Sequence, residues 1–167
     1  ILERTLDAGF VACIQLRLKN APEHKIRKAI DILKPIAQDR GVTFLLNDDP
    51  ELAANTGCDG VHVGQKDSCY ADARKFVGLD AIVGVTCHDS RHLGMVAAEQ
   101  GADYVAFGAF FETTTKTPKS YAKFEILEWW CEDMTVPAVA IGGITVDNCL
   151  PIIKTGVDFL AISSGVW

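Results

Sequence analysis

A short run near the start of the chain places two cations and an amide on one face of an extended strand. Polar and apolar residues alternate from Ile14 to Lys19, so Gln15, Arg17 and Lys19 share one side. In a parallel sheet the apolar side must pack on helices, and the polar side then faces the mouth of the fold. Cations concentrated there require an anion. An antiparallel edge strand with one solvated face explains the pattern equally well.

Carboxylates follow two further apolar runs of the chain. The polar residues after these runs are Asn47-Asp48-Asp49 and Gln65-Lys66-Asp67. Asp49 precedes a proline and is well placed as a helix N-cap, which leaves Asp48 and Asp67 as candidate metal ligands. Magnesium takes one or two carboxylates together with phosphate oxygens and water, so carboxylates beside Arg17 and Lys19 favour a Mg²⁺-pyrophosphate site. A structural salt bridge among the same groups is the alternative.

Three later segments carry groups that bind phosphate. They are the loop 111–119 with four threonines and two lysines, the pair Gly142-Gly143 and the pair Ser163-Ser164. Hydroxyl groups and Lys116 can grip phosphate oxygens as the first loop closes, although a plain surface loop would have the same composition. Glycine lets backbone N–H groups approach a phosphate, and barrel enzymes frequently bind one between their last two strand-helix loops. The glycine pair alone is a weak signal that the serines strengthen.

Two histidines and a threonine lie in or just after apolar runs. Thr86 and His88 end one run, and His62 lies between two valines in another. A lone histidine is more often a hydrogen-bonded core residue than a catalytic one. We therefore expect these residues only to line a pocket.

The composition restricts the class of protein. The 167 residues are 49% hydrophobic and 23% charged, which fits a single domain over residues 1–167. The 16 Lys and Arg against 22 Asp and Glu form no basic cluster, so no nucleic-acid partner is expected. Neither a membrane span nor a signal peptide is visible, which favours a cytoplasmic protein. Six cysteines without a C-x-x-C pair indicate reduced, inert core thiols and no structural zinc.

Apolar runs alternate with amphipathic stretches along the whole chain. The runs predict strands at 11–18, 42–46, 60–63, 81–86, 104–110, 138–141 and 159–162. Helices are predicted at 1–8, 23–38, 50–56, 70–77, 91–100, 124–132 and 146–155. This α/β alternation implies parallel strands with right-handed crossovers, in a doubly wound sheet or an eight-fold barrel. Even spacing without a Gly-x-Gly-x-x-Gly turn favours a (β/α)₈ TIM barrel that lacks its first strand and last helix, which leaves two unpaired strand edges.

With these segments in place, the chain resembles the thiamine-phosphate synthase family. The motifs that carry the resemblance are Gln15-Leu-Arg17-Leu-Lys19, Asn47-Asp48-Asp49, Gly60-Val-His-Val-Gly-Gln-Lys-Asp67, Gly84-Val-Thr-Cys-His88, Gly101-Ala-Asp-Tyr-Val105, Thr113-Thr-Thr115-Lys116 and Ala140-Ile-Gly-Gly-Ile-Thr145. They occur in the family's order and extend to Ser164. One departure is Leu18, where the family usually has Glu; by the alternation we expect Leu18 to face outward among helices.

The resemblance implies the following roles. The residues that hold the pyrimidine diphosphate would be Gln15, Arg17, Lys19, Asn47, Thr86 and Lys116. Those that bind the thiazole phosphate would be Thr113, Thr115, Gly143, Ser163 and Ser164. Asp48 and Asp67 would bind Mg²⁺, and Arg17, Lys19 and Lys116 would stabilise a departing pyrophosphate. The partners implied are these two small molecules, with a homo-oligomer left open and no interface assigned.

Two other functions fit parts of the pattern. A thiazole tautomerase-like isomerase would share the fold but needs no diphosphate site, so retention of Asp48, Arg17 and Lys19 favours the synthase. A non-catalytic barrel that binds phosphate ligands is the other alternative, and the unpaired strand edges keep it open. Ligand binding without pyrophosphate release would distinguish such a protein from an enzyme.

Overall fold

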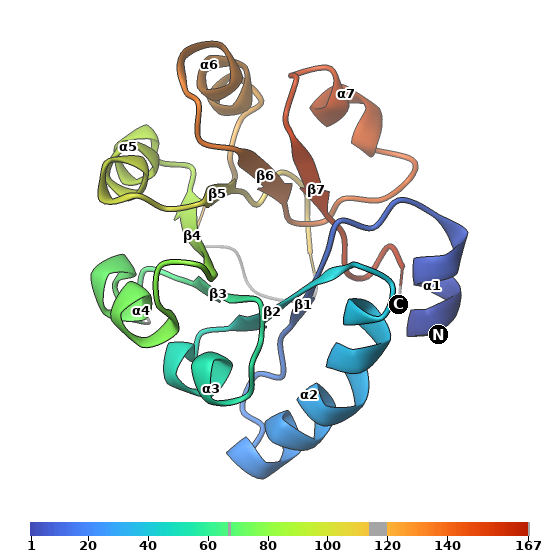
Figure 1. The fold of residues 1–167 in the computed structure, drawn as a ribbon. Helices are drawn as coiled ribbons and strands as arrows, with labels where there is room; N and C mark the ends of the chain where they lie inside the picture. Colours follow the sequence, from blue (N-terminus) through green and yellow to red (C-terminus); the bar gives the residue numbers. More distant parts are fainter. Residues whose placement is uncertain (67, 114–119, 167) are drawn as a thin grey trace. The chain divides into compact units, whose positions relative to one another are not determined.

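The computed structural model describes residues 1–66, 68–113 and 120–166. The chain divides into two compact units, Ile1–Val83 (unit 1) and Gly84–Trp167 (unit 2). Both units alternate strands with helices, and the labels of these elements are given in Figure 1. Within the described ranges no helix is both long and apolar enough to cross a membrane.

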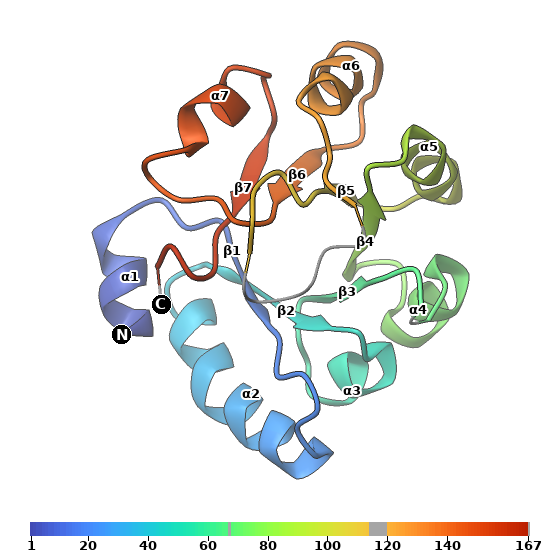
Figure 2. The same cartoon turned by 180° about the vertical axis from the view of Figure 1, so that it is seen from behind.

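In unit 1, strands β1, β2 and β3 run parallel, with β2 between the other two. The elements of this unit are α1 (Leu2–Ala8), β1 (Cys13–Leu16), α2 (Glu23–Gln38), β2 (Thr43–Asn47), α3 (Pro50–Asn55), β3 (Gly60–Val63) and α4 (Tyr70–Val77). Helices α2, α3 and α4 pack along the strands, as the two opposite views in Figures 1 and 2 show. Their contact buries Phe44, Leu46 and Val61 in one apolar core.

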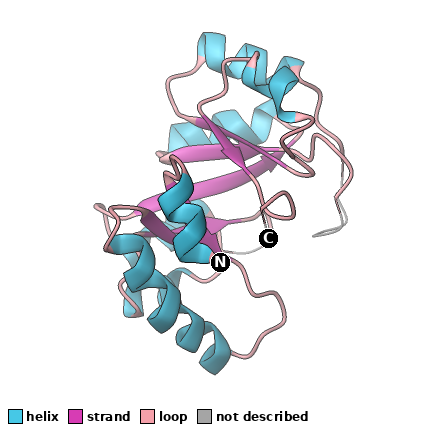
Figure 3. Ribbon diagram, turned by 90° about the vertical axis from the view of Figure 1, so that its right-hand side faces the viewer, coloured by secondary structure: helices cyan, strands magenta, loops and turns pink. Residues whose placement is uncertain are grey.

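Unit 2 repeats the arrangement with strands β4 to β7, which pair in parallel in chain order. Its elements are β4 (Ile82–His88, which begins at the end of unit 1), α5 (Arg91–Gln100), β5 (Tyr104–Phe107), α6 (Glu125–Asp133), β6 (Ala138–Ile141), α7 (Cys149–Ile153) and β7 (Phe159–Ala161). Figure 3 distinguishes the strands from the helices by colour. Trp130 is buried edge-to-face against Phe107 at a centroid distance of 5.1 Å. A Cβ at Gly94 would lie 2.6 Å from Trp130, so only glycine lets α5 approach this ring.

Aspartates fix the starts of strands in both units. The Asp59 carboxylate, just before β3, accepts a hydrogen bond from the Phe44 N–H of β2 at 2.7 Å. Asp158, just before β7, accepts one from the Ala138 N–H of β6 at 2.8 Å. Each carboxylate ties a strand to its sequence neighbour at the amino ends of the pair. The carboxyl ends of these strands are therefore not involved in this structural role.

The predicted order of elements is confirmed, and several elements have the predicted bounds, among them α2, β3, α4, α5 and β6. The seven strands are parallel within their units, as an α/β fold requires. Whether they belong to one closed barrel and one domain stays a prediction.

Three elements, β1, β5 and α7, are shorter than predicted by three residues or more. β1 ends at Leu16 rather than residue 18, although the polar-apolar alternation continues. β5 ends at Phe107 because the backbone turns away at Gly108, which has φ +154° and donates its N–H to the His88 carbonyl. α7 begins at Cys149 rather than residue 146, since residues 146–148 form a turn.

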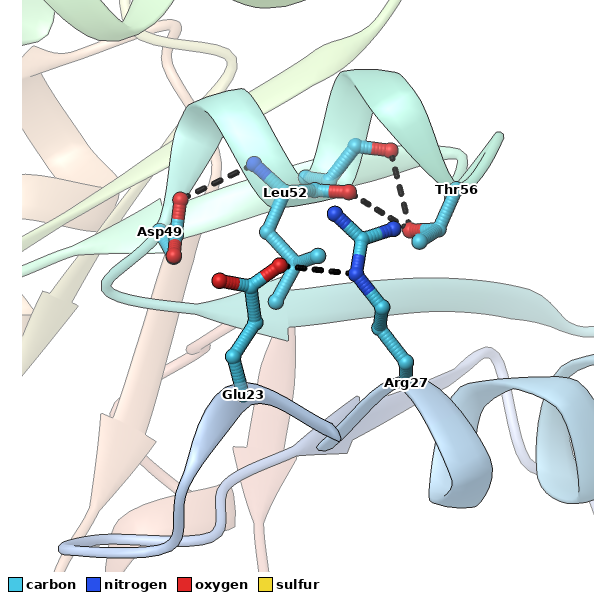
Figure 4. A network of polar contacts seen from close by, with 6 residues as sticks. Glu23, Arg27, Asp49, Leu52 and Thr56 are labelled. Carbon is cyan, nitrogen blue, oxygen red and sulfur yellow. Dashed lines mark hydrogen bonds and ion pairs between the residues drawn. The ribbon is translucent and has the colours of Figure 1, made fainter. Parts of the chain in front are cut away.

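Asp49 caps helix α3, as the Asp-Pro sequence predicted. Its Oδ1 accepts a hydrogen bond from the Leu52 N–H at 2.9 Å, and Pro50 occupies the first helical turn. Figure 4 shows this cap beside the Glu23–Arg27 ion pair of α2, which has an N–O distance of 2.7 Å. The Asp49 side chain is thus committed to the helix end.

Replacing this cap should cost stability. We expect Asp49→Ala to lower the free energy of unfolding by about 1 kcal/mol, because the Leu52 N–H loses its acceptor. Urea denaturation measures the effect, with Asp80→Ala as the control because Asp80 is an exposed carboxylate of the same unit. Equal unfolding midpoints for the two variants would contradict the capping role.

Candidate active site

In unit 1, the ends of β1 and β2 meet through two amide side chains. Gln15 Nε2 donates a hydrogen bond to Asn47 Oδ1 at 2.7 Å, and both side chains are half-buried. The strands are in register from Cys13 opposite Thr43 to Leu16 opposite Leu46, which brings both residues to the carboxyl end of the pair. The structure therefore joins two residues that the sequence assigned to one substrate, although they are 32 positions apart.

The two cations of the first motif follow β1 rather than lying in it. Arg17 is half-buried and Lys19 is exposed, so they extend the carboxyl end of the strand as a short polar segment. The prediction that their burial demands an anion is wrong for Lys19. Leu18 is also misplaced by the alternation: it is 41% exposed instead of packed among helices, because the strand has already ended at Leu16.

Asp48 has an unusual backbone conformation directly after β2. Its φ is +71°, in the left-handed region, and its N–H donates to the His62 carbonyl of β3 at 2.8 Å. Residues other than glycine adopt this conformation at a cost, and such residues concentrate at functional sites. The Asp48 side chain is exposed while the Asp49 carboxylate binds the Leu52 N–H. The local geometry is thus consistent with the prediction that Asp48 is a metal ligand and Asp49 a helix cap.

Within the described residues no group of three or more His, Cys, Asp or Glu side chains is placed to hold a metal ion. Asp48 offers one exposed carboxylate directly after β2, a group of the kind that Mg²⁺ takes together with phosphate oxygens and water. Asp67, the second predicted ligand, lies outside the described residues. His62, predicted to line the pocket, is 6% exposed and lies opposite Asn47 in the β2–β3 register.

In unit 2, strand β4 ends in a β-bulge. Thr86 pairs with Ala106 and His88 with Phe107, so Cys87 is an extra residue between them. His88 has φ +53°, a second left-handed conformation at a strand end. Thr86 and His88 are half-buried while Cys87 is fully buried. The bulge thus places two half-buried polar residues on either side of a core thiol.

The glycine pair after β6 packs directly on the loop after β5. Gly143 has φ +68°, and a Cβ there would lie 2.3 Å from the Glu112 carbonyl oxygen. The Phe111 N–H donates to the Gly142 carbonyl at 3.0 Å. No other residue type fits position 143 without displacing the loop that carries Thr113. The structure therefore places Thr113 and Gly143 in adjoining segments, and their role in binding thiazole phosphate stays a prediction.

The segment after β7 packs on the loop after β6. A Cβ at Gly165 would lie 3.0 Å from the Ile144 carbonyl oxygen, and Ser163 and Ser164 beside it are exposed. The loops after β5, β6 and β7 thus form a continuous group in unit 2. Thr115 and Lys116 lie outside the described residues.

One polar residue of this region was missed by the sequence reasoning. Asn148 bonds both ends of the segment from Gly143 to Thr145, through a donor and an acceptor of its side-chain amide. No local signal points to these bonds, because the usual asparagine turn uses an N–H two residues further along the chain, whereas Asn148 accepts from Thr145, three residues earlier. The predicted helix 146–155 also placed Asn148 inside the helix.

These observations define the fold class: an α/β protein of parallel strands whose candidate functional residues lie at or after the carboxyl ends of the strands. Comparisons with known proteins give the family. The family model of thiamine monophosphate synthase matches residues 1–166, and the chain belongs to the thiamine-phosphate synthase family of transferases.

Individual relatives agree with this assignment. The chain is 63% identical to the thiamine-phosphate synthase of Rhodospirillum centenum over 166 residues, which cover 99% of this chain and 80% of that one. It is 48% identical to the thiamine-phosphate synthase of Erythrobacter litoralis, again over 99% of this chain and 80% of the relative. Among solved structures, thiamine phosphate pyrophosphorylase from Pyrococcus furiosus superposes with a TM-score of 0.85 at 30% identity, covering 96% of this chain and 76% of that one. Neither alternative function from the sequence gains support.

The cysteines are less uniform than predicted. Cys87 is buried, but Cys13 and Cys69 are exposed, so the prediction of core thiols is wrong for those two. Cys69 is the residue before helix α4, and Cys13 is the first residue of strand β1. Both therefore lie at the ends of elements, where fewer neighbouring residues cover a side chain. Burial raises the pKa of the Cys87 thiol to about 12.

This difference predicts selective alkylation. At pH 8 the raised pKa keeps the Cys87 thiol protonated, and the thiolate is the reactive form. Iodoacetamide should therefore modify exposed Cys69 in the native protein and leave Cys87 intact, as peptide mass spectrometry can measure. Labelling in urea is the control and should modify both. Equal native labelling of the two residues would contradict the buried environment of Cys87.

Proposed function

We propose that this chain joins 4-amino-2-methyl-5-(diphosphooxymethyl)pyrimidine to thiazole phosphate, forming thiamine phosphate and releasing pyrophosphate. Family membership supports the type of reaction. The observation that most directly supports the substrate assignment is the 2.7 Å hydrogen bond between Gln15 and Asn47, which joins two residues assigned to one ligand. The amides orient the pyrimidine diphosphate, and Arg17 and Lys19 follow in the same segment.

The reaction exchanges one bond for another. The bond between the pyrimidinylmethyl carbon and the diphosphate oxygen breaks, and its electron pair leaves with pyrophosphate. The lone pair of the thiazole nitrogen then forms the new bond to that carbon, which makes the nitrogen a cationic thiazolium centre. No protein nucleophile is required, so the work of the chain is to bind, orient and stabilise charge.

Charge on the departing pyrophosphate is the main demand on the protein. Arg17, Lys19 and Lys116 supply cations for it, and the guanidinium of Arg17 offers a fixed fork of donors to phosphate oxygens. Asp48 and Asp67 would hold Mg²⁺, which when bound adds positive charge at the leaving group. The exposure of Asp48 and its position directly after β2 support this assignment.

The thiazole phosphate is assigned to unit 2. Gly143 and the exposed Ser163 and Ser164 offer backbone N–H and hydroxyl groups suited to phosphate oxygens, with Thr113 in the adjoining loop. Thr86 at the end of β4 is assigned to the pyrimidine substrate. Each group stands at the carboxyl end of a strand, which supports the (β/α)₈ barrel as the parent fold. A cytoplasmic location and a homo-oligomeric state stay predictions.

Adjacent aspartates provide a sharp test of the metal assignment. We expect Asp48→Ala to lower kcat on the order of 100-fold or more, because charge stabilisation at the leaving group is lost. Asp49→Ala is the matched control: it removes a neighbouring carboxylate that caps a helix and should retain activity at temperatures where it stays folded. Thiamine phosphate formation, followed by mass spectrometry with and without a chelator, measures both. Equal losses in the two variants, or chelator-resistant turnover, would remove Asp48 from a metal site.

A further inference from the structure

The segment from Gly143 to Thr145 is closed by the side chain of Asn148. Asn148 Oδ1 accepts a hydrogen bond from the Thr145 N–H at 2.8 Å, and Nδ2 donates one to the Gly143 carbonyl at 2.9 Å. The Asn148 backbone N–H also donates to the Thr145 carbonyl at 3.3 Å. Both side-chain bonds have good lengths, so the amide is held at its donor and its acceptor.

The loop needs such a restraint because its two glycines give the backbone high conformational freedom. Gly142 and Gly143 have φ of +102° and +68°, and glycine loses more conformational entropy on ordering than any other residue. Helix α7 starts only at Cys149, so no regular helical hydrogen bonds order residues 143–145. Ile144 is buried and anchors the middle of the segment, while Asn148 holds its two sides.

The bond to the Gly143 carbonyl also fixes a donor. A peptide unit is planar and trans, so its N–H points opposite to its carbonyl. By holding the Gly143 carbonyl, Asn148 sets the direction of the Ile144 N–H. Gly143 itself packs against the Glu112 carbonyl, and the carbonyl of the next peptide, that of Ile144, packs against Gly165, so a rotation of the Gly143–Ile144 peptide would disturb all three loops of unit 2.

We propose that Asn148 is a positioning residue for the thiazole-phosphate subsite. It acts through Gly143, by keeping the backbone of the glycine loop in the orientation that receives the phosphate. The inference rests on the proposed function, since that function assigns the loop to the phosphate. If the inference is correct, substitution of Asn148 must weaken the binding of thiazole phosphate and leave the binding of the pyrimidine diphosphate unchanged.

The test compares four variants of the whole chain by steady-state kinetics. We expect Asn148→Ala to raise the KM for thiazole phosphate between about 10-fold and 100-fold, the range typical of lost positioning contacts, with kcat changed far less. The KM for the pyrimidine diphosphate should stay within about 2-fold, because its assigned residues lie elsewhere. Asn148→Asp keeps the acceptor for the Thr145 N–H but loses the donor to Gly143, and should show the same selective defect.

Asp158→Ala is the control for a merely structural role. It removes another side-chain-to-backbone hydrogen bond of unit 2, at the amino end of β6, and should lower the melting temperature without a selective change in either KM. If Asn148→Ala behaves like Asp158→Ala, or raises both KM values together, the positioning role is overturned.

Gly143→Ala separates failure of this inference from failure of the proposed function. It places a Cβ against the Glu112 carbonyl and so displaces the loop directly. If it raises the KM for thiazole phosphate while Asn148→Ala does not, the loop binds the phosphate but Asn148 does not position it. If Gly143→Ala leaves that KM unchanged in a folded, active protein, the loop is not the phosphate subsite and both proposals for it fail.

Discussion

In a parallel sheet the carboxyl ends of neighbouring strands lie along one edge, and in each unit of this chain the residues with chemistry follow those ends. Parallel pairing in register brings Gln15 of β1 to Asn47 of β2, and it brings the loop after β6 onto the loop after β5. The amino ends serve stability instead, since Asp59 and Asp158 bond the N–H groups near the starts of neighbouring strands. This division lets the carboxyl edge carry polar groups that a core could not accommodate.

Unusual backbone conformations concentrate at the same edge. Asp48 and His88 are left-handed directly at the ends of β2 and β4, and Gly142 and Gly143 follow β6. At each of these positions the backbone leaves the extended conformation where the strand ends. A hydrogen bond or a packing contact supports the new conformation. The His62 carbonyl holds Asp48, the Gly108 N–H holds the His88 carbonyl, and Asn148 holds Gly143. The surrounding structure thus compensates the local cost at these strand ends, and Asp48 and Gly143 among them are positions where ligands are proposed to bind.

Sequence patterns predicted the elements better than the connections between them. Helix α2 and strand β3 have the predicted bounds because periodicity and flanking residues agree, and Asp49 was identified as a cap because Asp-Pro is a local signal. The polar-apolar alternation around Gln15 correctly predicted a strand, but the alternation continues beyond Leu16, where the strand ends. The predicted position of Leu18 among helices was therefore wrong. Asn148 was missed because its bonds depend on where α7 starts. The contact of Gly143 with Glu112 depends on strand pairing between distant segments, which no local pattern encodes.

We propose that this chain couples loss of pyrophosphate to bond formation at the thiazole nitrogen. Quantifying pyrophosphate and thiamine phosphate in the same reaction, with Mg²⁺ and both substrates and then with each component omitted, tests this coupling. Equal amounts of the two products are expected, formed only when every component is present. Pyrophosphate without thiamine phosphate, or ligand binding with neither product, would contradict the coupling.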